Sequence, residues 1–259
     1  MGPILGKGSF GIVYLAEQKS TGNFVAIKQI EKSKLNTSNK KIRAKKDIFI
    51  PKFLGCQHKN IICVLDAIET DESIFIISEY LDNTKTLKSY IPNLTTHKGQ
   101  LELLDLFQQL AYMHSKGIIH NDIKLANILV KANIPFYIDF DLSCTLPYSE
   151  LKRFPCQSKI SGTPNYISPE ILLRKFGDYR QKDIYALGIV FFGVITQKMP
   201  FQRETLNATY LAILEESVPE FTSNIPDLDK LILDMLNKEP IRPTAEEIKN
   251  RLNELIRII

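Results

Sequence analysis

The chain lacks tryptophan, and none of its four cysteines form a C-x-x-C pair. With no dense cysteine pattern, we expect reduced thiols, as in proteins kept inside the cell. The chain also lacks an apolar run long enough to span a bilayer, and its first residues do not resemble a signal peptide. These absences predict an intracellular and cytoplasmic protein with no membrane partner, and they leave a nuclear location open.

A strong charge of either sign is also missing. The formal net charge is +4, from 33 basic and 29 acidic residues among 259. That excess is too small to indicate nucleic acid, so we expect no nucleic-acid partner. The basic residues between positions 40 and 46 are more simply interpreted as a solvated helix face or loop than as a nucleic-acid patch.

The hydrophobic pattern changes along the chain. Residues 12–15, 24–27, 60–65 and 74–77 are short β-prone or apolar runs, whereas Pro51 interrupts the lysine-rich stretch between them. Later segments show helical spacing, including a nearly continuous apolar run at 183–197, and Thr244 with Glu247 predicts a capping box. With no internal repeat or low-complexity linker, this pattern predicts an α+β fold with a small β-rich part, residues 1–81, and a larger helical part, residues 82–259.

Two motifs in the first part can serve phosphate chemistry. Gly6, Gly8 and Gly11 form G-x-G-x-x-G, in which glycines let backbone N–H groups approach phosphates. Alone, the motif is weak and equally describes a glycine-rich hairpin. A dinucleotide-binding loop would require a helix immediately afterwards, but a β-prone run follows. Lys28 ends the run Val-Ala-Ile-Lys and can direct its ammonium at phosphate oxygens, although in isolation it is more simply an exposed strand lysine.

Two further motifs in the second part supply carboxylates. Asp122 follows His120 and Asn121, and Asn127 comes five residues later, so a possible proton acceptor is paired with an amide oxygen that can bind a cation. Asp139 lies just after a β-prone run, where a carboxylate is a common magnesium ligand. A single acid in such a place is more often a turn former.

The order and spacing of these four motifs resemble those of the eukaryotic protein kinases, over almost the whole chain. The segment Gly-Thr-Pro-Asn-Tyr-Ile-Ser-Pro-Glu, at 162–170, is similar to the end of a kinase activation segment. Arg242 matches the arginine that pairs with the Glu170 position in the family. The resemblance implies a bilobal kinase fold, with residues 1–81 as N-lobe and hinge and residues 82–259 as C-lobe.

The resemblance also implies a role for each matching residue. Asp122 accepts the proton of the substrate hydroxyl, Lys124 neutralises the γ-phosphate, and Asn127 and Asp139 bind Mg²⁺, with Mn²⁺ as an alternative. Lys28 holds the α- and β-phosphates of ATP. The remaining nucleotide contacts are expected from Leu5, from the glycine loop at Gly6, Gly8 and Gly11, from the apolar walls Val13, Ala26 and Leu129, and from Ser78, Glu79 and Leu81 at the hinge, with Ser78 as gatekeeper.

Lys124 and the Gly162–Thr163 pair resemble serine/threonine kinases rather than tyrosine kinases. The expected partners are therefore ATP and proteins with serine or threonine acceptors, and we expect no attached regulatory domain. Small-molecule kinases share the loop around Asp122 but lack the peptide-docking segment at 162–170.

The chain departs from the family pattern at several places. Asn121 replaces the arginine before the catalytic aspartate, and Asp141 replaces the glycine of Asp-Phe-Gly. Asp47 matches the small-lobe helix glutamate that partners the lysine, but it is one methylene shorter. These changes keep open the alternative of a pseudokinase that binds nucleotide or partner proteins without phosphotransfer. Because Asn121 cannot grip a phosphate, we also expect activity that is independent of phosphorylation at Thr145, Ser149, Ser158 and Ser161.

Overall fold

A computed structural model describes residues 2–8, 11–55, 58, 60–91 and 103–258, with side chains in the last helix described as far as residue 254. Backbone contacts divide the chain into two compact units. Unit 1 contains Met1–Thr84 together with Ile138–Asp141, and unit 2 contains Lys85–Tyr137 and Leu142–Ile259. Within the described residues, no helix is both long and apolar enough to cross a membrane.

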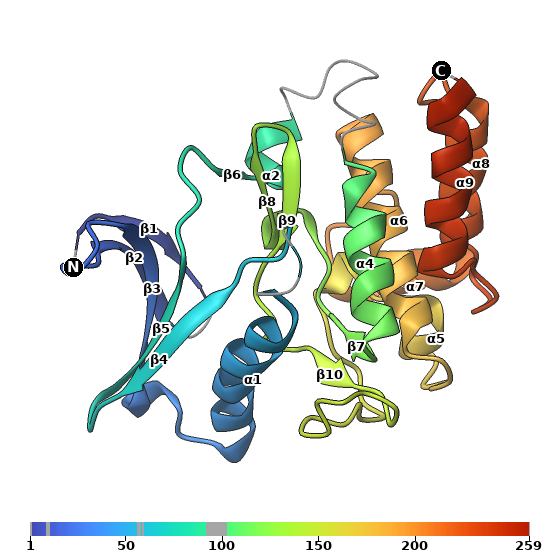
Figure 1. Cartoon of the computed structure of the whole chain (residues 1–259). Coiled ribbons are helices and arrows are strands. Elements are labelled where there is room, and N and C mark those ends of the chain that lie inside the picture. The colour runs from blue at the N-terminus through green and yellow to red at the C-terminus, as the bar shows by residue number, and fades with distance from the viewer. Residues whose placement is uncertain (1, 9–10, 56–57, 59, 92–102, 259) are drawn as a thin grey trace. The chain divides into compact units, whose positions relative to one another are not determined.

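Unit 1 is built on an antiparallel five-stranded sheet with the strand order β1-β2-β3-β5-β4 (Figure 1). Its β-branched and aromatic runs form strands whose alternate side chains face the core. The strands are β1 Ile4–Lys7, β2 Gly11–Glu17, β3 Phe24–Glu31, β4 Val64–Glu69 and β5 Ser73–Glu79, with a short 3₁₀ turn η1 at Lys32–Lys34.

Helix α1, Ser38–Leu54, packs on this sheet. Thr37 caps its first turn by accepting a hydrogen bond from the Lys40 N–H at 3.3 Å. Contrary to the expectation that Pro51 interrupts this stretch, the helix continues through Pro51 to its last residue. Because Pro51 lies in the last turn, its ring disturbs only the end of the helix. The small core beneath α1 is formed by Ile30, Leu35, Ala44, Val64 and Ile76.

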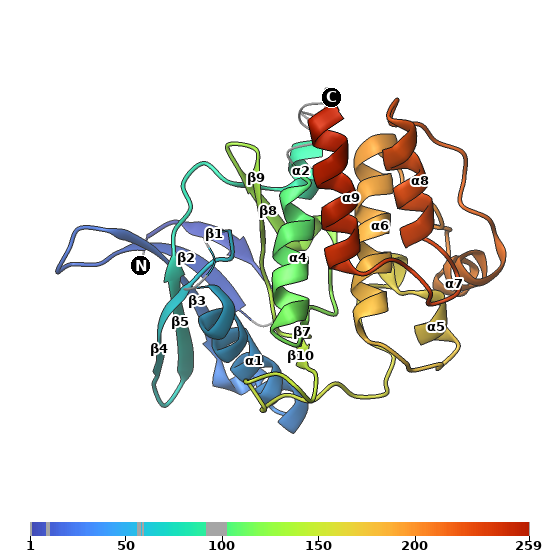
Figure 2. The same ribbon diagram turned by 45° about the vertical axis from the view of Figure 1, so that its right-hand side comes forward.

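Unit 2 is mainly helical. Helix α4, Asp105–Ser115, lies beside α9, Ala245–Ile258, and helix α6, Arg180–Thr196, lies beside α8, Pro226–Met235 (Figure 2). The strands are short: β6 Lys85–Thr86, β8 Ile128–Lys131 and β9 Ile134–Tyr137 form one sheet, while β7 Ile118–Ile119 pairs with β10 Cys144–Thr145. The helices are α2 Leu87–Tyr90, α4 Asp105–Ser115, α5 Pro169–Leu172, α6 Arg180–Thr196, α7 Leu206–Glu215, α8 Pro226–Met235 and α9 Ala245–Ile258, with 3₁₀ turns η4 Leu125–Asn127 and η5 Pro164–Tyr166.

Two helix predictions in unit 2 are confirmed. The apolar run predicted at 183–197 lies in α6, whose residues Gln181–Val194 are all buried, so an all-round apolar surface correctly indicated a central helix. At the start of α9, the Glu247 N–H donates to the Thr244 Oγ1 at 3.2 Å and the Thr244 N–H donates to the Glu247 carboxylate at 2.7 Å. These reciprocal hydrogen bonds are the predicted capping box.

Candidate active site

One face of the unit 1 sheet carries four of the residues expected to contact a nucleotide. Val13 of β2 lies opposite Lys28 of β3, and Ala26 of β3 lies opposite Ser78 of β5. Because side chains alternate along a strand and opposite residues of a pair share a face, all four point to the same side of the sheet. All four are half-buried, so this face presents a lysine between small and apolar neighbours.

The glycine loop is described at its two ends, because residues 9 and 10 lie outside the described residues. The Gly8 N–H donates to the Gly11 carbonyl at 2.9 Å, which turns the chain between β1 and β2. A side chain at Gly11 would collide with the backbone carbonyl of Gln29 on β3. Gly11 is therefore required by strand packing as well as by any approach to phosphate, whereas Gly6 has open space around it.

Lys28 is the centre of a group of charges in unit 1. Its ammonium is paired with the Asp47 carboxylate of α1, and it lies 3.5 Å from the Asp139 carboxylate. Burial works to lower the pKa of Lys28, but the two carboxylates raise it above its ordinary value, so the lysine stays charged. Asp47 also accepts a hydrogen bond from the Phe140 N–H at 3.2 Å. Asp47 therefore pairs with Lys28, as its match to the small-lobe helix glutamate implied, and it also contacts the segment 139–141, which the sequence did not predict.

A second ion pair joins α1 to the same segment, and the sequence analysis missed it. The Arg43 guanidinium lies 2.5 Å from the Asp141 carboxylate. The interpretation of the basic run as a solvated face holds for Lys41 and Lys45, which are exposed, but it is wrong for Arg43. The spacing places Arg43 on the helix face of Asp47, four residues later, but it does not identify Asp141 as the partner.

Asp141 is buried among like charges. Burial, followed by the neighbouring Asp139 and Asp47 carboxylates, raises the pKa of Asp141 to about 7, while Arg43 works to lower it. Three carboxylates and two cations thus share one small region of unit 1. The glycine that the family has at this position would contribute no charge at all.

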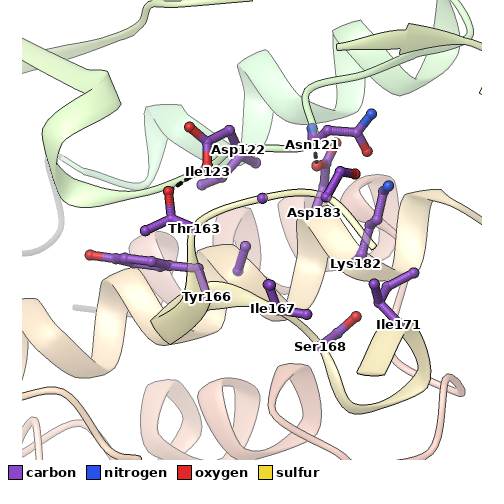
Figure 3. Close-up of a pocket in the computed structure, with 13 residues that line it drawn as sticks. Asn121, Asp122, Ile123, Thr163, Tyr166, Ile167, Ser168, Ile171, Lys182 and Asp183 are labelled. Carbon is purple, nitrogen blue, oxygen red and sulfur yellow. Dashed lines mark hydrogen bonds between the residues drawn. The ribbon is translucent and has the colours of Figure 1, made fainter. Parts of the chain in front are cut away.

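In unit 2, the Asp122 carboxylate is held by three side chains. Its Oδ1 accepts from the Thr163 hydroxyl at 2.7 Å (Figure 3), and its Oδ2 accepts from the Lys124 ammonium at 2.6 Å and from the Asn127 amide at 3.0 Å. Thr163 follows Gly162, whose φ of 115° favours glycine. The geometry joins the loop 120–127 to the segment 162–170 directly at the proposed proton acceptor.

The backbone of that loop is anchored by Asp183 of α6. Its carboxylate accepts from the His120 N–H at 2.8 Å and the Asn121 N–H at 2.9 Å, and it lies 3.1 Å from the His114 ring nitrogen. Burial works to raise the pKa of Asp183, but the hydrogen bond and charge of His114 hold it below its ordinary value. A buried carboxylate satisfied in this way fixes the backbone that leads to Asp122.

The side-chain NH2 group of Asn121 already has hydrogen-bond partners within the protein. Asn121 adopts a φ of 68°, and its side-chain amide donates to the Leu142 carbonyl at 2.9 Å and to the Cys144 sulfur at 3.1 Å. Cys144 forms a disulfide with Cys156, so the expectation of reduced thiols is wrong for this pair. The disulfide could not be predicted from the sequence, because the two cysteines are twelve residues apart and not in a C-x-x-C motif.

The segment 162–170 is anchored at its end as the sequence predicted. Arg242 donates to both oxygens of Glu170, with both nitrogen–oxygen distances at 2.9 Å, and both side chains are buried. Two parallel charge-assisted hydrogen bonds give this pair a fixed geometry. The expected pairing of Arg242 with Glu170 is confirmed.

Lys182 lines a pocket with the residues around Asp122, although the sequence did not single it out (Figure 3). It is buried, and burial lowers its pKa to about 8 although Asp183 and Glu170 oppose the change. In the described part of the chain, its ammonium lies over the Tyr179 ring at 5.1 Å rather than in an ion pair. A buried cation of this kind is energetically costly.

The remaining predicted nucleotide contacts lie on strands, except Leu81, which comes after the end of β5. The Glu79 N–H donates to the Cys63 carbonyl at 3.1 Å, and the Glu79 carboxylate accepts from the Cys63 N–H at 2.7 Å, which fixes the end of β5. Leu81 follows it, and Leu5 on β1 is 43% exposed. Leu129 is a half-buried residue of β8 and belongs to unit 2, with Asp122, Lys124 and Asn127.

The side chains expected to bind a cation suit Mg²⁺ by their chemistry. Magnesium is usually held by one or two protein oxygens together with substrate phosphates, rather than by a complete protein cage. The Asn127 amide nitrogen is turned to Asp122, so its oxygen is the atom that can ligate a cation. The described residues contain no cluster of three or more histidine, cysteine or acidic side chains that could hold a metal by itself.

Comparisons with known proteins agree with this geometry. The family model for the protein kinase domain matches residues 1–252. The chain is 34% identical over 232 residues to a serine/threonine-protein kinase of Acanthamoeba polyphaga mimivirus, covering 83% of this chain and 80% of that protein. It is 32% identical over 260 residues to CBL-interacting serine/threonine-protein kinase 13 of Arabidopsis thaliana, and 29% identical over 249 residues to CBL-interacting protein kinase 25 of Oryza sativa subsp. japonica.

These two matches cover 96% and 93% of this chain, but the chain spans only about half the length of either plant relative, 49% and 48%. The chain belongs to the protein kinase family, in its serine/threonine class. Members of this family use ATP and a divalent cation to phosphorylate proteins. None of the relatives' names favours the pseudokinase alternative.

Proposed function

We propose that this chain transfers the γ-phosphate of Mg-ATP to serine and threonine hydroxyls of protein substrates. The observation that carries the proposal is the arrangement at Asp122, whose carboxylate is held by Thr163, Lys124 and Asn127. Such a carboxylate is oriented before substrate arrives, which is what a positioned proton acceptor requires.

The residues in unit 2 would act on the acceptor side of the reaction. Asp122 would orient the substrate hydroxyl and take its proton as the oxygen–phosphorus bond forms. Lys124 lies 2.6 Å from Asp122, so its ammonium is placed to offset the charge that develops on the transferred phosphoryl group. Thr163 would keep the peptide-docking segment in register with Asp122 through its hydroxyl.

The residues in unit 1 would act on the nucleotide. Lys28, kept charged by Asp47 and Asp139, would hold the α- and β-phosphates, and the glycine loop would cover them with backbone N–H groups. The half-buried Val13 and Ala26 would form apolar walls for the adenine, next to the backbone of Glu79 and Leu81 at the hinge. We assign Asp139, and Asn127 of unit 2, as ligands of the two divalent cations, which when bound supply charge neutralisation on the phosphate oxygens.

A phosphotransfer assay with γ-labelled ATP on an arrayed peptide library tests this proposal. The array should offer serine, threonine and tyrosine as acceptors, with Mg²⁺ and Mn²⁺ compared. We expect label on serine and threonine peptides and almost none with Asp139→Asn. Asp71→Asn, a change to an exposed residue of unit 1, is the matched control and should behave as wild type. Label only on tyrosine, or transfer that survives in Asp139→Asn, would contradict the proposal.

A further inference from the structure

Helix α1 is joined to the segment 139–141 at two points one helical turn apart. Asp47 accepts the Phe140 N–H at 3.2 Å and pairs with Lys28, whereas Arg43 pairs with Asp141 at 2.5 Å. Residues four apart lie on the same helix face, so both contacts come from one side of α1. All of these residues belong to unit 1.

The two contacts involve both of this chain's departures from the family pattern in unit 1. A glycine at position 141 would have no side chain to offer Arg43. An aspartate at position 47 is one methylene shorter than the glutamate, so α1 must be held closer for its carboxylate to reach Lys28. The Asp141 side chain is only 4% exposed and that of Arg43 is 24% exposed, so solvent screens their ion pair less than a surface pair.

We propose that Arg43 is a positioning residue, whose ion pair with Asp141 holds α1 where the short Asp47 carboxylate reaches Lys28. The inference rests on the proposed function for the role of Lys28 in holding ATP. It makes the two substitutions mutually dependent: Asp141 supplies the contact that the shorter Asp47 needs. Arg43 acts on the reaction through Asp47 and Lys28.

A simpler role for Arg43 is to neutralise a buried carboxylate, since removing one partner of a buried pair leaves an uncompensated charge. The two roles predict different double variants. If Arg43 only neutralises Asp141, then Arg43→Met combined with Asp141→Gly restores activity, because no uncompensated carboxylate is left at position 141. If Arg43 positions α1, that double variant stays impaired, and activity returns only when Asp47→Glu is added.

The experiment compares Arg43→Met, the double variant and the triple variant with wild type. We expect Arg43→Met and the double variant to lose about tenfold or more in kcat/KM for ATP, and the triple variant to recover to within about threefold. Arg43→Lys should keep a large part of the activity, because it keeps the charge. Lys41→Met, an exposed position on the same helix, is the matched control and should leave kcat/KM unchanged.

Amide hydrogen exchange in the nucleotide-free protein provides a second readout that does not need activity. The Phe140 amide should exchange at least about tenfold faster in Arg43→Met and in the double variant than in wild type, with α9 unchanged. Restored activity in the double variant, or an unchanged Phe140 amide, would overturn the inference. If wild type transferred no phosphate, the proposed function would fail, but the exchange measurement would still decide whether Arg43 holds α1.

Discussion

The groups around Lys28 and the groups around Asp122 are held in place by different interactions. In unit 1, Lys28 lies among opposite and like charges that balance one another. In unit 2, Asp122 is held by a hydroxyl, an amide and one ammonium, on a loop whose backbone is bound by Asp183. Charges interact over longer distances than hydrogen bonds, so removing one charge in unit 1 disturbs all the others.

The difference also bears on how neighbouring residues compensate each departure from the family pattern. The departures at positions 47 and 141 lie in the charged region, and each has an opposite charge as partner. The departure at Asn121 lies in the hydrogen-bonded region, and there the side-chain NH2 group donates to a carbonyl and a sulfur. In the region around Lys28 the substituted residues form ion pairs, and in the region around Asp122 the substituted residue forms hydrogen bonds.

The largest effect is expected at Asp122. Asp122→Asn keeps the size of the side chain but removes the proton acceptor, so kcat should fall by about 10²–10⁴-fold. The neighbours of Asp122 mainly donate hydrogen bonds to it, and the amide oxygen of the variant can still accept hydrogen bonds from them. The melting temperature of the variant should therefore change little. Steady-state kinetics and thermal unfolding of the same preparation measure both, with Asp227→Asn as a control in unit 2. Retention of more than a few per cent of the activity would refute the role of Asp122.

A smaller effect is expected at Ser78, which shares the sheet face of Lys28 but carries no charge. Its hydroxyl lies 3.4 Å from the Ala26 carbonyl, and a serine here leaves space that a phenylalanine would fill. Ser78→Phe should weaken ATP-competitive inhibitors with bulky substituents by about tenfold or more, because overpacking is costly, while leaving KM for ATP nearly unchanged. Inhibition curves for both forms decide it, and equal sensitivity would remove Ser78 from the gatekeeper position.

Much of the site could be predicted because its motifs are local in sequence. The spacing from His120 to Asn127 places Asp122 and Asn127 in one loop, and the structure brings their side chains to 3.0 Å. The partners that the sequence did not reveal are separated by long stretches of chain. Arg43 and Asp141 are 98 residues apart, and no local pattern indicates their contact.

The same limit, that only features local in sequence could be predicted, applies to the fold. The capping box at Thr244 and the buried helix α6 follow from residues close together in sequence, and both were predicted. The passage of α1 through Pro51 was not, because packing of the helix on the sheet outweighs a proline in its last turn. Nor was the disulfide of Cys144 and Cys156, which depends on how residues 144–156 fold back.

Lys182 gives a way to test the contrast between the two units. It is a buried charge in unit 2, where the groups around Asp122 are held mainly by hydrogen bonds. Its pKa is lowered to about 8 in the folded protein, below the ordinary lysine value, so the unfolded chain holds the proton more tightly. The cost of burying the ammonium is therefore fully present below pH 8 and disappears as the pH rises from 8 towards the unfolded value.

Lys182→Met should accordingly be more stable than wild type at pH 7, by about 1–3 kcal/mol, and this advantage should shrink by pH 10. Urea unfolding of both proteins at the two pH values measures it. Lys198→Met, an exposed position just after α6, is the control and should show no such pH dependence. A destabilised Lys182→Met variant at pH 7 would mean that the ammonium is stabilised by its surroundings instead.

The smallest effect is expected from the activation segment's hydroxyl groups. Among the four candidate phosphorylation sites, Thr145 and Ser149 are buried, whereas Ser158 is exposed and Ser161 is half-buried. A modifying enzyme can therefore reach only the last two in the folded protein.

The activation segment already contains covalent and hydrogen bonds that do not require phosphate. The disulfide between Cys144 and Cys156 closes it covalently, and the Thr145 N–H donates to the Phe154 carbonyl at 2.7 Å. A disulfide around a loop of this length contributes about 3 kcal/mol by restricting the unfolded chain, which exceeds a typical single hydrogen bond. Asn121 holds the start of the segment at Leu142.

We therefore expect Ser158→Ala combined with Ser161→Ala, and phosphatase-treated wild type, to keep kcat within about twofold of untreated enzyme. Cys144→Ser combined with Cys156→Ser should instead lower the melting temperature, because it removes the covalent tie. Kinetics and thermal unfolding on all four proteins make the comparison within one experiment. A tenfold fall in kcat after phosphatase treatment, reproduced by the double alanine variant with its fold intact, would show that phosphate, rather than the disulfide and Asn121, orders this segment.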